Sequence, residues 1–129
     1  MSGTASTAGI DIFVSARFLA NFDRPATHNL ECIEPGRIGA LRLRGKQGGI
    51  DLFTVYLTTG DAGPLRSAQR RALAAAILPQ PLTLTVIGGD FNHTTMEEDR
   101  ASLRTCEWTG GHQTREDREF TELVASPHR

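Results

Sequence analysis

The chain has 129 residues, 39% of them hydrophobic and 22% charged, which are the proportions of one ordinary globular domain with a modest core. Its 14 basic and 15 acidic residues give a formal net charge of -1, so no overall positive field holds a phosphate backbone non-specifically. No apolar run reaches the roughly 18 residues of a membrane span, and the polar start does not resemble a secretory signal, so we expect an intracellular chain without a span.

The first half of the chain predicts strands. Residues 1–8 are expected to be a disordered tail, and a single domain at 9–129 begins with the alternation Ile10, Ile12 and Val14, typical of a half-buried strand whose far end can turn helical. Further strands are predicted around Cys32 and at 37–44, separated by a proline-glycine turn. In the second of these, Arg42 and Arg44 would point away from the core.

A hairpin loop at 45–49 leads to a returning strand at 50–57. We expect this strand to pair with both 37–44 and 82–87. Because it is apolar on both sides, it should also be covered on both.

The second half predicts a helix, a strand and a second helix. Pro64 marks the start of the first helix, which ends before Pro79. Residues 82–87 have the β-branched, apolar character of an interior strand, and 115–124 predicts a lightly packed helix. The apolar face of the first helix is predicted to carry Leu65, Ala68, Ala72, Leu73, Ala76 and Ile77, with Arg66, Gln69, Arg70 and Arg71 on its other sides.

Candidate chemistry lies where the strand at 82–87 runs into Gly88-Gly89-Asp90-Phe91-Asn92. The carboxyl end of a strand is where an α/β fold displays polar side chains into a crevice. Asp90 and Asn92 are two residues apart, so in extended backbone they would face the same side. Gly88 and Gly89 allow a close backbone approach or an unusual dihedral angle. Asp and Asn also cap strand ends for purely structural reasons, and that alternative stays open.

This segment resembles the Gly-Asp-Phe-Asn signature of the endonuclease/exonuclease/phosphatase superfamily of metal-dependent hydrolases. The strand at 51–57 and the arginine-bearing helix after it are similar to the family's order of elements, and the resemblance covers roughly residues 9–92. It implies an α/β fold: part of a four-layer, DNase-like sandwich of mainly antiparallel strands with outer helices.

The resemblance also implies roles for particular residues. Asp90 would orient or deprotonate the attacking water, and Asn92 would help to hold the scissile phosphate. Tyr56 can hydrogen-bond toward the phosphate, although a half-buried strand tyrosine with a satisfied hydroxyl fits equally well. Arg66 and Arg70 would bind phosphate if they line a groove, and otherwise belong to a solvated helix face. The implied cofactor is Mg²⁺ or Mn²⁺, with unknown ligands.

Two departures from the family limit the functional prediction. The family's metal-ligating Glu should precede Gly9, where only eight residues stand, and the final Ser126-Pro127-His128-Arg129 lacks the acid of the family's Asp-His pair. Glu97, Glu98 and Asp99 are possible substitute metal ligands, but helix capping explains them more simply.

We therefore expect a fragment of a Mg-dependent phosphoesterase or nuclease that hydrolyses phosphodiester or phosphomonoester bonds, with nucleic acid among its candidate partners. The alternative is a non-catalytic remnant or interaction module that keeps the scaffold. Whether the isolated chain is active, its substrate and its oligomeric state stay open.

Overall fold

The architecture is α/β, with helices over a four-stranded mixed sheet; the computed structural model describes residues 9–23, 30–93, 101–108 and 114–125. The strands, in sheet order, are β1 (Glu31–Glu34), β2 (Ile38–Gly45), β3 (Gly48–Tyr56) and β4 (Thr83–Asp90). The first two pairings are antiparallel, and β3 pairs with β4 in parallel. The prediction that the strand at 50–57 pairs with both of its neighbours is therefore confirmed.

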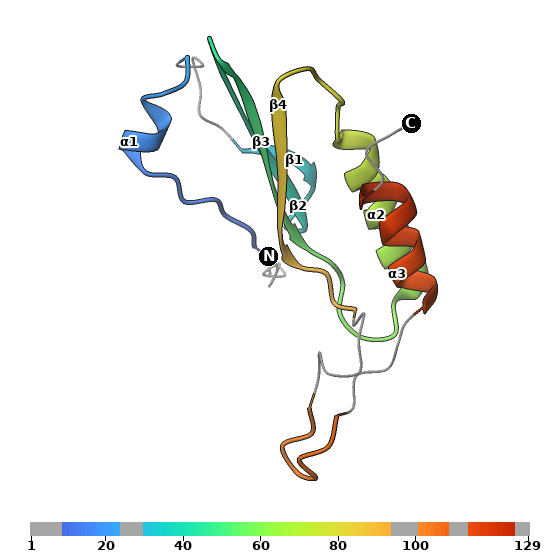
Figure 1. Ribbon diagram of the computed structural model, residues 1–129. Coiled ribbons are helices and arrows are strands. Elements are labelled where there is room, and N and C mark those ends of the chain that lie inside the picture. Colours follow the sequence, from blue (N-terminus) through green and yellow to red (C-terminus); the bar gives the residue numbers. More distant parts are fainter. Residues whose placement is uncertain (1–8, 24–29, 94–100, 109–113, 126–129) are drawn as a thin grey trace, which may run out of the picture.

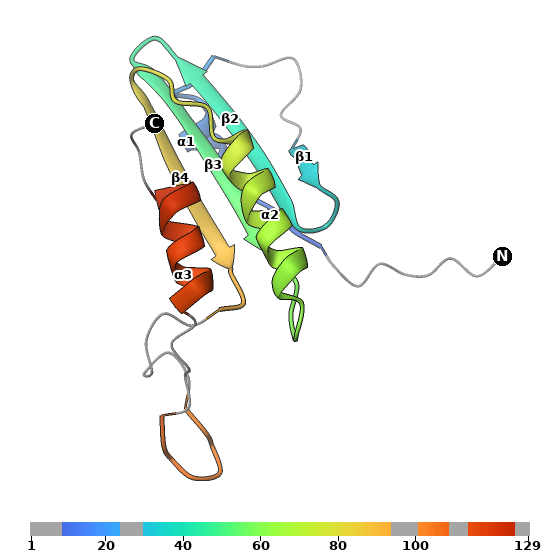
Figure 2. The ribbon, with the colours of Figure 1, turned by 90° about the vertical axis from the view of Figure 1, so that its right-hand side faces the viewer.

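Two helices lie side by side over one face of the sheet (Figures 1 and 2). Helix α2 (Gly63–Ala76) connects β3 to β4 and begins with Pro64 in its first turn, as predicted. Helix α3 (Thr114–Phe120) continues as the π-helix η2 (Thr121–Ala125), which agrees with the helix predicted at 115–124. No helix in the described part of the chain has the length and apolar character needed to cross a membrane.

The core lies between the sheet and these helices. Its fully buried apolar residues are Ile38, Ala40, Phe53, Val55, Leu57 and Leu73.

The buried face of α2 differs from the predicted one. Arg66, Gln69, Arg70 and Leu73, spaced as one helical stripe, are the buried residues, whereas Leu65 is 49% exposed. The polar side chains can be buried because they are hydrogen-bonded. The Gln69 side-chain amide, for example, accepts a hydrogen bond from the backbone N–H of Thr58 at 3.0 Å and donates one to the Thr58 hydroxyl at 2.9 Å. The prediction was therefore wrong for Arg66, Gln69 and Arg70, whereas Arg71 is exposed as expected.

The expectation that Arg42 and Arg44 point away from the core was also wrong. Their guanidiniums bind the two carboxylate oxygens of Asp51, at 2.9 and 2.6 Å, and Asp51 is fully buried. Arg42 additionally donates to the carbonyl of Ala76 at the end of α2 and to the Glu31 carboxylate. Alternation along β2 therefore places these arginines toward the helices, where a buried carboxylate compensates their charge.

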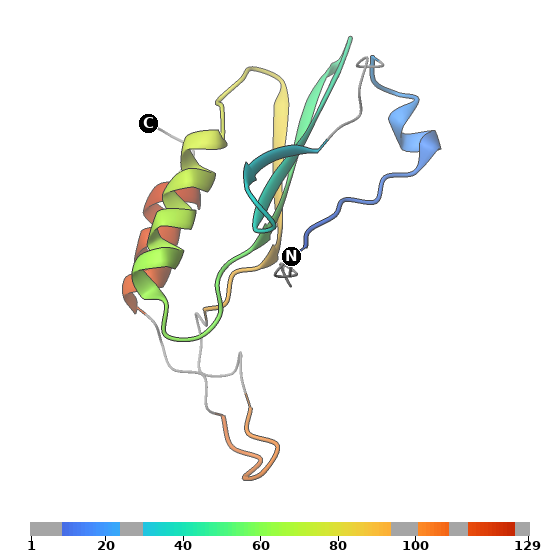
Figure 3. The same cartoon turned by 180° about the vertical axis from the view of Figure 1, so that it is seen from behind.

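The N-terminal segment lies on the opposite side of the sheet from α2 and α3 (Figure 3). The strand predicted at Ile10, Ile12 and Val14 is absent from residues 9–15, which are extended but unpaired in the sheet, and a short helix α1 (Ala16–Leu19) follows. Ile10 packs beside Gly39 of β2, and Leu43 on the same sheet face is buried. This segment thus covers the β2 side of that face.

The β4 side of the same face is open. Leu84 is 60% exposed and Val86 43% exposed, and β4 is the last strand of the sheet among the described residues. The prediction of a central, interior strand at 82–87 was therefore wrong, because an apolar β-branched run does not distinguish an edge strand from an internal one.

Helix α3 is held to α2 by a network of ion pairs. Arg70, only 1% exposed, donates to Glu116 at 3.0 Å and to Glu119 at 2.6 Å, and Arg66 donates to Glu116 at 2.7 Å. Hydrogen bonds from Arg66, and then from Arg70, lower the pKa of Glu116 below its ordinary 4.5. Burial acts to raise the pKa of Glu119, but hydrogen bonds from Ser67 and Arg70 outweigh it, and that pKa is lowered too.

These lowered pKa values predict acid-sensitive stability. A carboxylate whose pKa is lower in the folded state stabilises the fold above its unfolded pKa, and this contribution is lost as the pH falls through the folded pKa. Urea unfolding should therefore show a free energy of unfolding that declines below about pH 4.5. The double variant Glu116→Gln/Glu119→Gln should flatten that decline, and Glu122→Gln, an exposed residue of η2, should not. An equal decline in the double variant would contradict the assignment.

Candidate functional site

The predicted catalytic residues lie at the carboxyl ends of β3 and β4. The parallel register places Tyr56 opposite Asp90, and the backbone N–H of Leu57 donates to the carbonyl of Asp90 at 2.9 Å. Asp90 is exposed and Tyr56 is half-buried. A carboxylate and a phenol from two strands are thus brought together at one end of the sheet.

Asn92 lies just beyond the strand and does not continue its geometry. Its φ of 50° is in the left-handed region, which Asn adopts more readily than most residues. Its side-chain amide donates to the carbonyl of Leu57 at 2.6 Å, and its backbone N–H donates to the Asp90 carboxylate at 2.9 Å. The period-two geometry from which we expected Asp90 and Asn92 to face the same side therefore does not apply, since the strand ends at Asp90.

The two glycines before Asp90 differ. Gly89 has φ 143°, and a Cβ atom there would overlap the backbone of Val55 on β3. Gly88 has no heavy atom within 4 Å of a Cβ position. The unusual dihedral angle is therefore found at Gly89, and the close approach there is to the backbone of β3.

Tyr56 has a neighbour that the sequence did not single out. The guanidinium carbon of Arg37 lies 5.0 Å from the centre of the Tyr56 ring, and the backbone N–H of Tyr56 donates to the Arg37 carbonyl at 2.7 Å. Within the described residues the Tyr56 hydroxyl has no hydrogen-bond partner. One signal was available in the sequence: Arg37 follows the turn before β2, so pairing β2 with β3 brings it level with Tyr56.

Arg66 and Arg70 lie elsewhere, between α2 and α3. They help to line a cavity of about 770 Å³, in which their guanidiniums contact Glu116 and Glu119. Two further Arg66 bonds go to the carbonyls of Thr58 and Gly60. Phosphate binding by these two arginines stays a prediction, and it would require the phosphate to displace carboxylates that already hold them.

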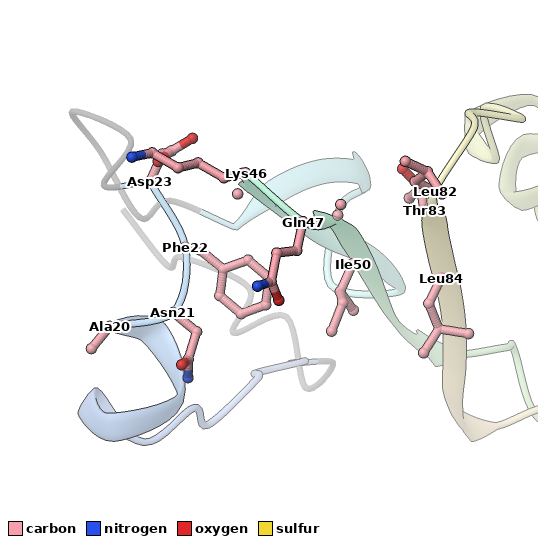
Figure 4. A pocket seen from close by; sticks show the side chains of 13 residues that line it. Ala20, Asn21, Phe22, Asp23, Lys46, Gln47, Ile50, Leu82, Thr83 and Leu84 are labelled. Carbon is pink, nitrogen blue, oxygen red and sulfur yellow. The ribbon is translucent and has the colours of Figure 1, made fainter.

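Another cavity, of about 840 Å³, lies at the amino end of β4 (Figure 4). Phe22, Gln47, Ile50 and Leu84 are among its lining side chains, and Lys46 lies at its hairpin side. Neither cavity is lined by the residues at the carboxyl end of β4.

The remaining candidates are His93 and the possible metal-ligating residues. The His93 ring packs against Phe91 and Phe120 in a loop. Within the ranges described, no three His, Cys, Asp or Glu side chains form a group that could hold a metal. Glu97, Glu98, Asp99 and the segment 126–129 lie outside the described residues.

Asp90 nevertheless suits part of a magnesium site. Mg²⁺ is commonly held by one or two carboxylates together with water and substrate phosphate oxygens.

Comparison of the chain with protein-family models, with curated proteins and with solved structures found no match.

Proposed function

We propose that the chain carries part of the active site of a magnesium-dependent phosphoesterase or nuclease of the endonuclease/exonuclease/phosphatase type. The observation that carries the proposal is that Tyr56, at the end of β3, lies opposite Asp90, at the end of β4. Asp90 belongs to the Gly-Asp-Phe-Asn segment. The ligand class is a phosphodiester or a phosphomonoester, and nucleic acid is one candidate.

The residues at this end of the sheet have suitable chemistry. The exposed carboxylate of Asp90 can take a proton from an attacking water. The Tyr56 hydroxyl can donate to a phosphate oxygen, and the Asn92 amide has a second N–H besides the one bound to Leu57. Mg²⁺ or Mn²⁺, when bound, would neutralise charge on the phosphate.

The open face of the sheet supports the proposed DNase-like sandwich. Leu84 and Val86 form an exposed apolar strip on the face away from α2 and α3, beside the half-buried Ile50 and Leu52. Two sheets that pack face to face bury strips of this kind. We therefore propose that this sheet is one of the two inner layers of such a sandwich.

The 129-residue chain should hydrolyse phosphodiesters very weakly or not at all with Mg²⁺. Groups that act as a unit in catalysis are strongly non-additive, and Asp90, Asn92 and Tyr56 form only part of such a unit. The assay is hydrolysis of bis-p-nitrophenyl phosphate and of plasmid DNA, with and without Mg²⁺. Any weak metal-dependent hydrolysis should vanish in Asp90→Ala and persist in Asp11→Ala, a matched variant at an exposed aspartate.

The outcomes separate the candidate functions. Weak metal-dependent hydrolysis that Asp90→Ala abolishes supports the proposal over the alternative, a non-catalytic module that keeps the scaffold, whereas complete absence of hydrolysis agrees with both. Hydrolysis that is unchanged in Asp90→Ala would refute a role for this carboxylate. Fast metal-dependent turnover that Asp90→Ala abolishes would show that other residues of the chain, such as Glu97, Glu98 or Asp99, complete a metal site.

A further inference from the structure

Arg37, Tyr56 and Asp90 form a row across three adjacent strands. Arg37 directly precedes β2 and is hydrogen-bonded to Tyr56 at the end of β3, which in turn lies opposite Asp90 at the end of β4. Ile38 and Val55 face the helices, so alternation turns Arg37 and Tyr56 to the other face. The stacking of the Arg37 guanidinium on the Tyr56 ring agrees with this placement.

The Arg37 guanidinium differs from the buried arginines of this fold because no described carboxylate pairs with it. Among the described residues, its side-chain hydrogen bond runs from Nη1 to the Tyr56 carbonyl, at 3.5 Å. Within that part of the chain, most of its N–H donors are therefore available to a ligand. The arginines that do pair with carboxylates are Arg42, Arg44, Arg66, Arg70 and Arg71.

The Arg37 side chain is also held in place before any ligand arrives. It is half-buried and rests on an aromatic ring, whose face attracts the guanidinium charge. Holding the planar guanidinium in position lowers the entropy lost when it binds an anion. Such a guanidinium can donate two parallel hydrogen bonds to a phosphate group.

Arg37 would also offset the repulsion between Asp90 and a phosphate bound at this row of residues. Asp90 is a carboxylate, and a phosphate placed beside it is repelled. A guanidinium on the far side of Tyr56 offsets this repulsion and draws the phosphate over the tyrosine hydroxyl. Arg66 and Arg70 are not available for this, because they are bound to Glu116 and Glu119.

We propose that Arg37 is the phosphate-binding residue of this site, donating from its guanidinium to non-bridging oxygens of a phosphate ester bound across Tyr56 and Asp90. The inference rests on the proposed function. It assigns the contact with the anion to Arg37, just before β2, and the activation of water to Asp90, at the end of β4.

The test is binding, measured without metal and apart from hydrolysis. Inorganic phosphate and a dinucleotide phosphodiester are titrated into the ¹⁵N-labelled chain, and the amide and arginine Nε–H signals are followed by NMR. We expect the Arg37, Tyr56 and Asp90 signals to shift together. In Arg37→Met, which keeps an apolar stem over the ring, affinity should fall by about 10-fold or more, as for the loss of a hydrogen bond to a charged group.

Two further variants complete the design. Arg37→Lys should recover part of the affinity, because it restores the charge but not the planar fork. Arg17→Met, at an exposed arginine of α1, should bind as the unmodified chain does. Urea unfolding of each variant checks that the fold is kept, and Arg37→Gln replaces Arg37→Met if the latter does not fold.

The outcomes distinguish this inference from the proposed function. Phosphate binding at the row that is equally strong in Arg37→Met would overturn the inference, as would no shift in the row at millimolar phosphate. Asp90-dependent hydrolysis in that same preparation would still leave the proposed function standing. Binding that requires Arg37, in a chain that hydrolyses nothing, would support the inference under either candidate function.

Discussion

Replacing Gly89 by alanine is expected to destabilise the chain by about 3 kcal/mol or more, or to prevent folding. Two costs combine. The backbone at Gly89 has φ 143°, which a residue with a side chain adopts only at a cost of order 1–3 kcal/mol. The new methyl group would also overlap the Val55 backbone, and forced overpacking adds about 1–3 kcal/mol. Urea unfolding followed by far-UV circular dichroism measures the loss.

Gly88→Ala is the matched control for this substitution. Gly88 is on the same strand, its backbone does not have the left-handed φ of Gly89, and a Cβ atom there meets nothing within 4 Å. Its free energy of unfolding should change by less than about 1 kcal/mol, since alanine is less costly than glycine inside a strand. Equal losses in the two variants would show that the close approach of β3 and β4 at Gly89 is not needed.

Asp51→Ala is expected to cost about 3 kcal/mol, although it removes only a short side chain. Asp51 lies on β3 and is fully buried on the helix side of the sheet, where it binds Arg42 and Arg44 of β2. Removing one partner of a buried ion pair leaves the other charge uncompensated, which typically costs about 3–5 kcal/mol. We choose the lower end because both arginines reach solvent. The measurement is again the free energy of unfolding in urea.

Asp11→Ala serves as the control for Asp51→Ala, because Asp11 is exposed in the N-terminal segment. Surface substitutions of this kind change stability by no more than about 0.5 kcal/mol. A loss of under 1 kcal/mol in Asp51→Ala would mean that the arginines find water or another partner in its place.

The sheet was largely predictable because its signals are local. The turn at Lys46 and Gln47 joins two strands, and their pairing follows directly from this short connection. Pro64 predicted the start of α2. Position within the sheet was not predictable in this way. Nothing in residues 82–87 distinguishes an edge strand from a central one, because that depends on which segment lies beside it.

Burial of charged side chains was the other source of error. Hydropathy predicted that Arg66, Arg70 and Arg42 lie in solvent, yet each is bound by a carboxylate. Glu116 and Glu119 are distant in sequence from Arg66 and Arg70 and could not be matched to them without the three-dimensional arrangement, whereas Asp51 lies opposite Arg42 in the β2–β3 hairpin. The same limit applies to the candidate site. The family resemblance indicated Asp90 and Tyr56, whereas Arg37 could be placed beside Tyr56 only from the register of the β2–β3 pairing, and its stacking on the Tyr56 ring is seen only in the structure.

The edge position of β4 also makes the candidate site conditional on the docking of one strand. Tyr56 and Asp90 meet only through the β3–β4 pairing, so peeling β4 away would separate them while leaving the β2–β3 hairpin paired. A ligand that needs both residues binds only when β4 is paired with β3. Its binding therefore stabilises this pairing, and the pairing strengthens binding by the same free energy. The site and the edge of the sheet therefore form one thermodynamic unit.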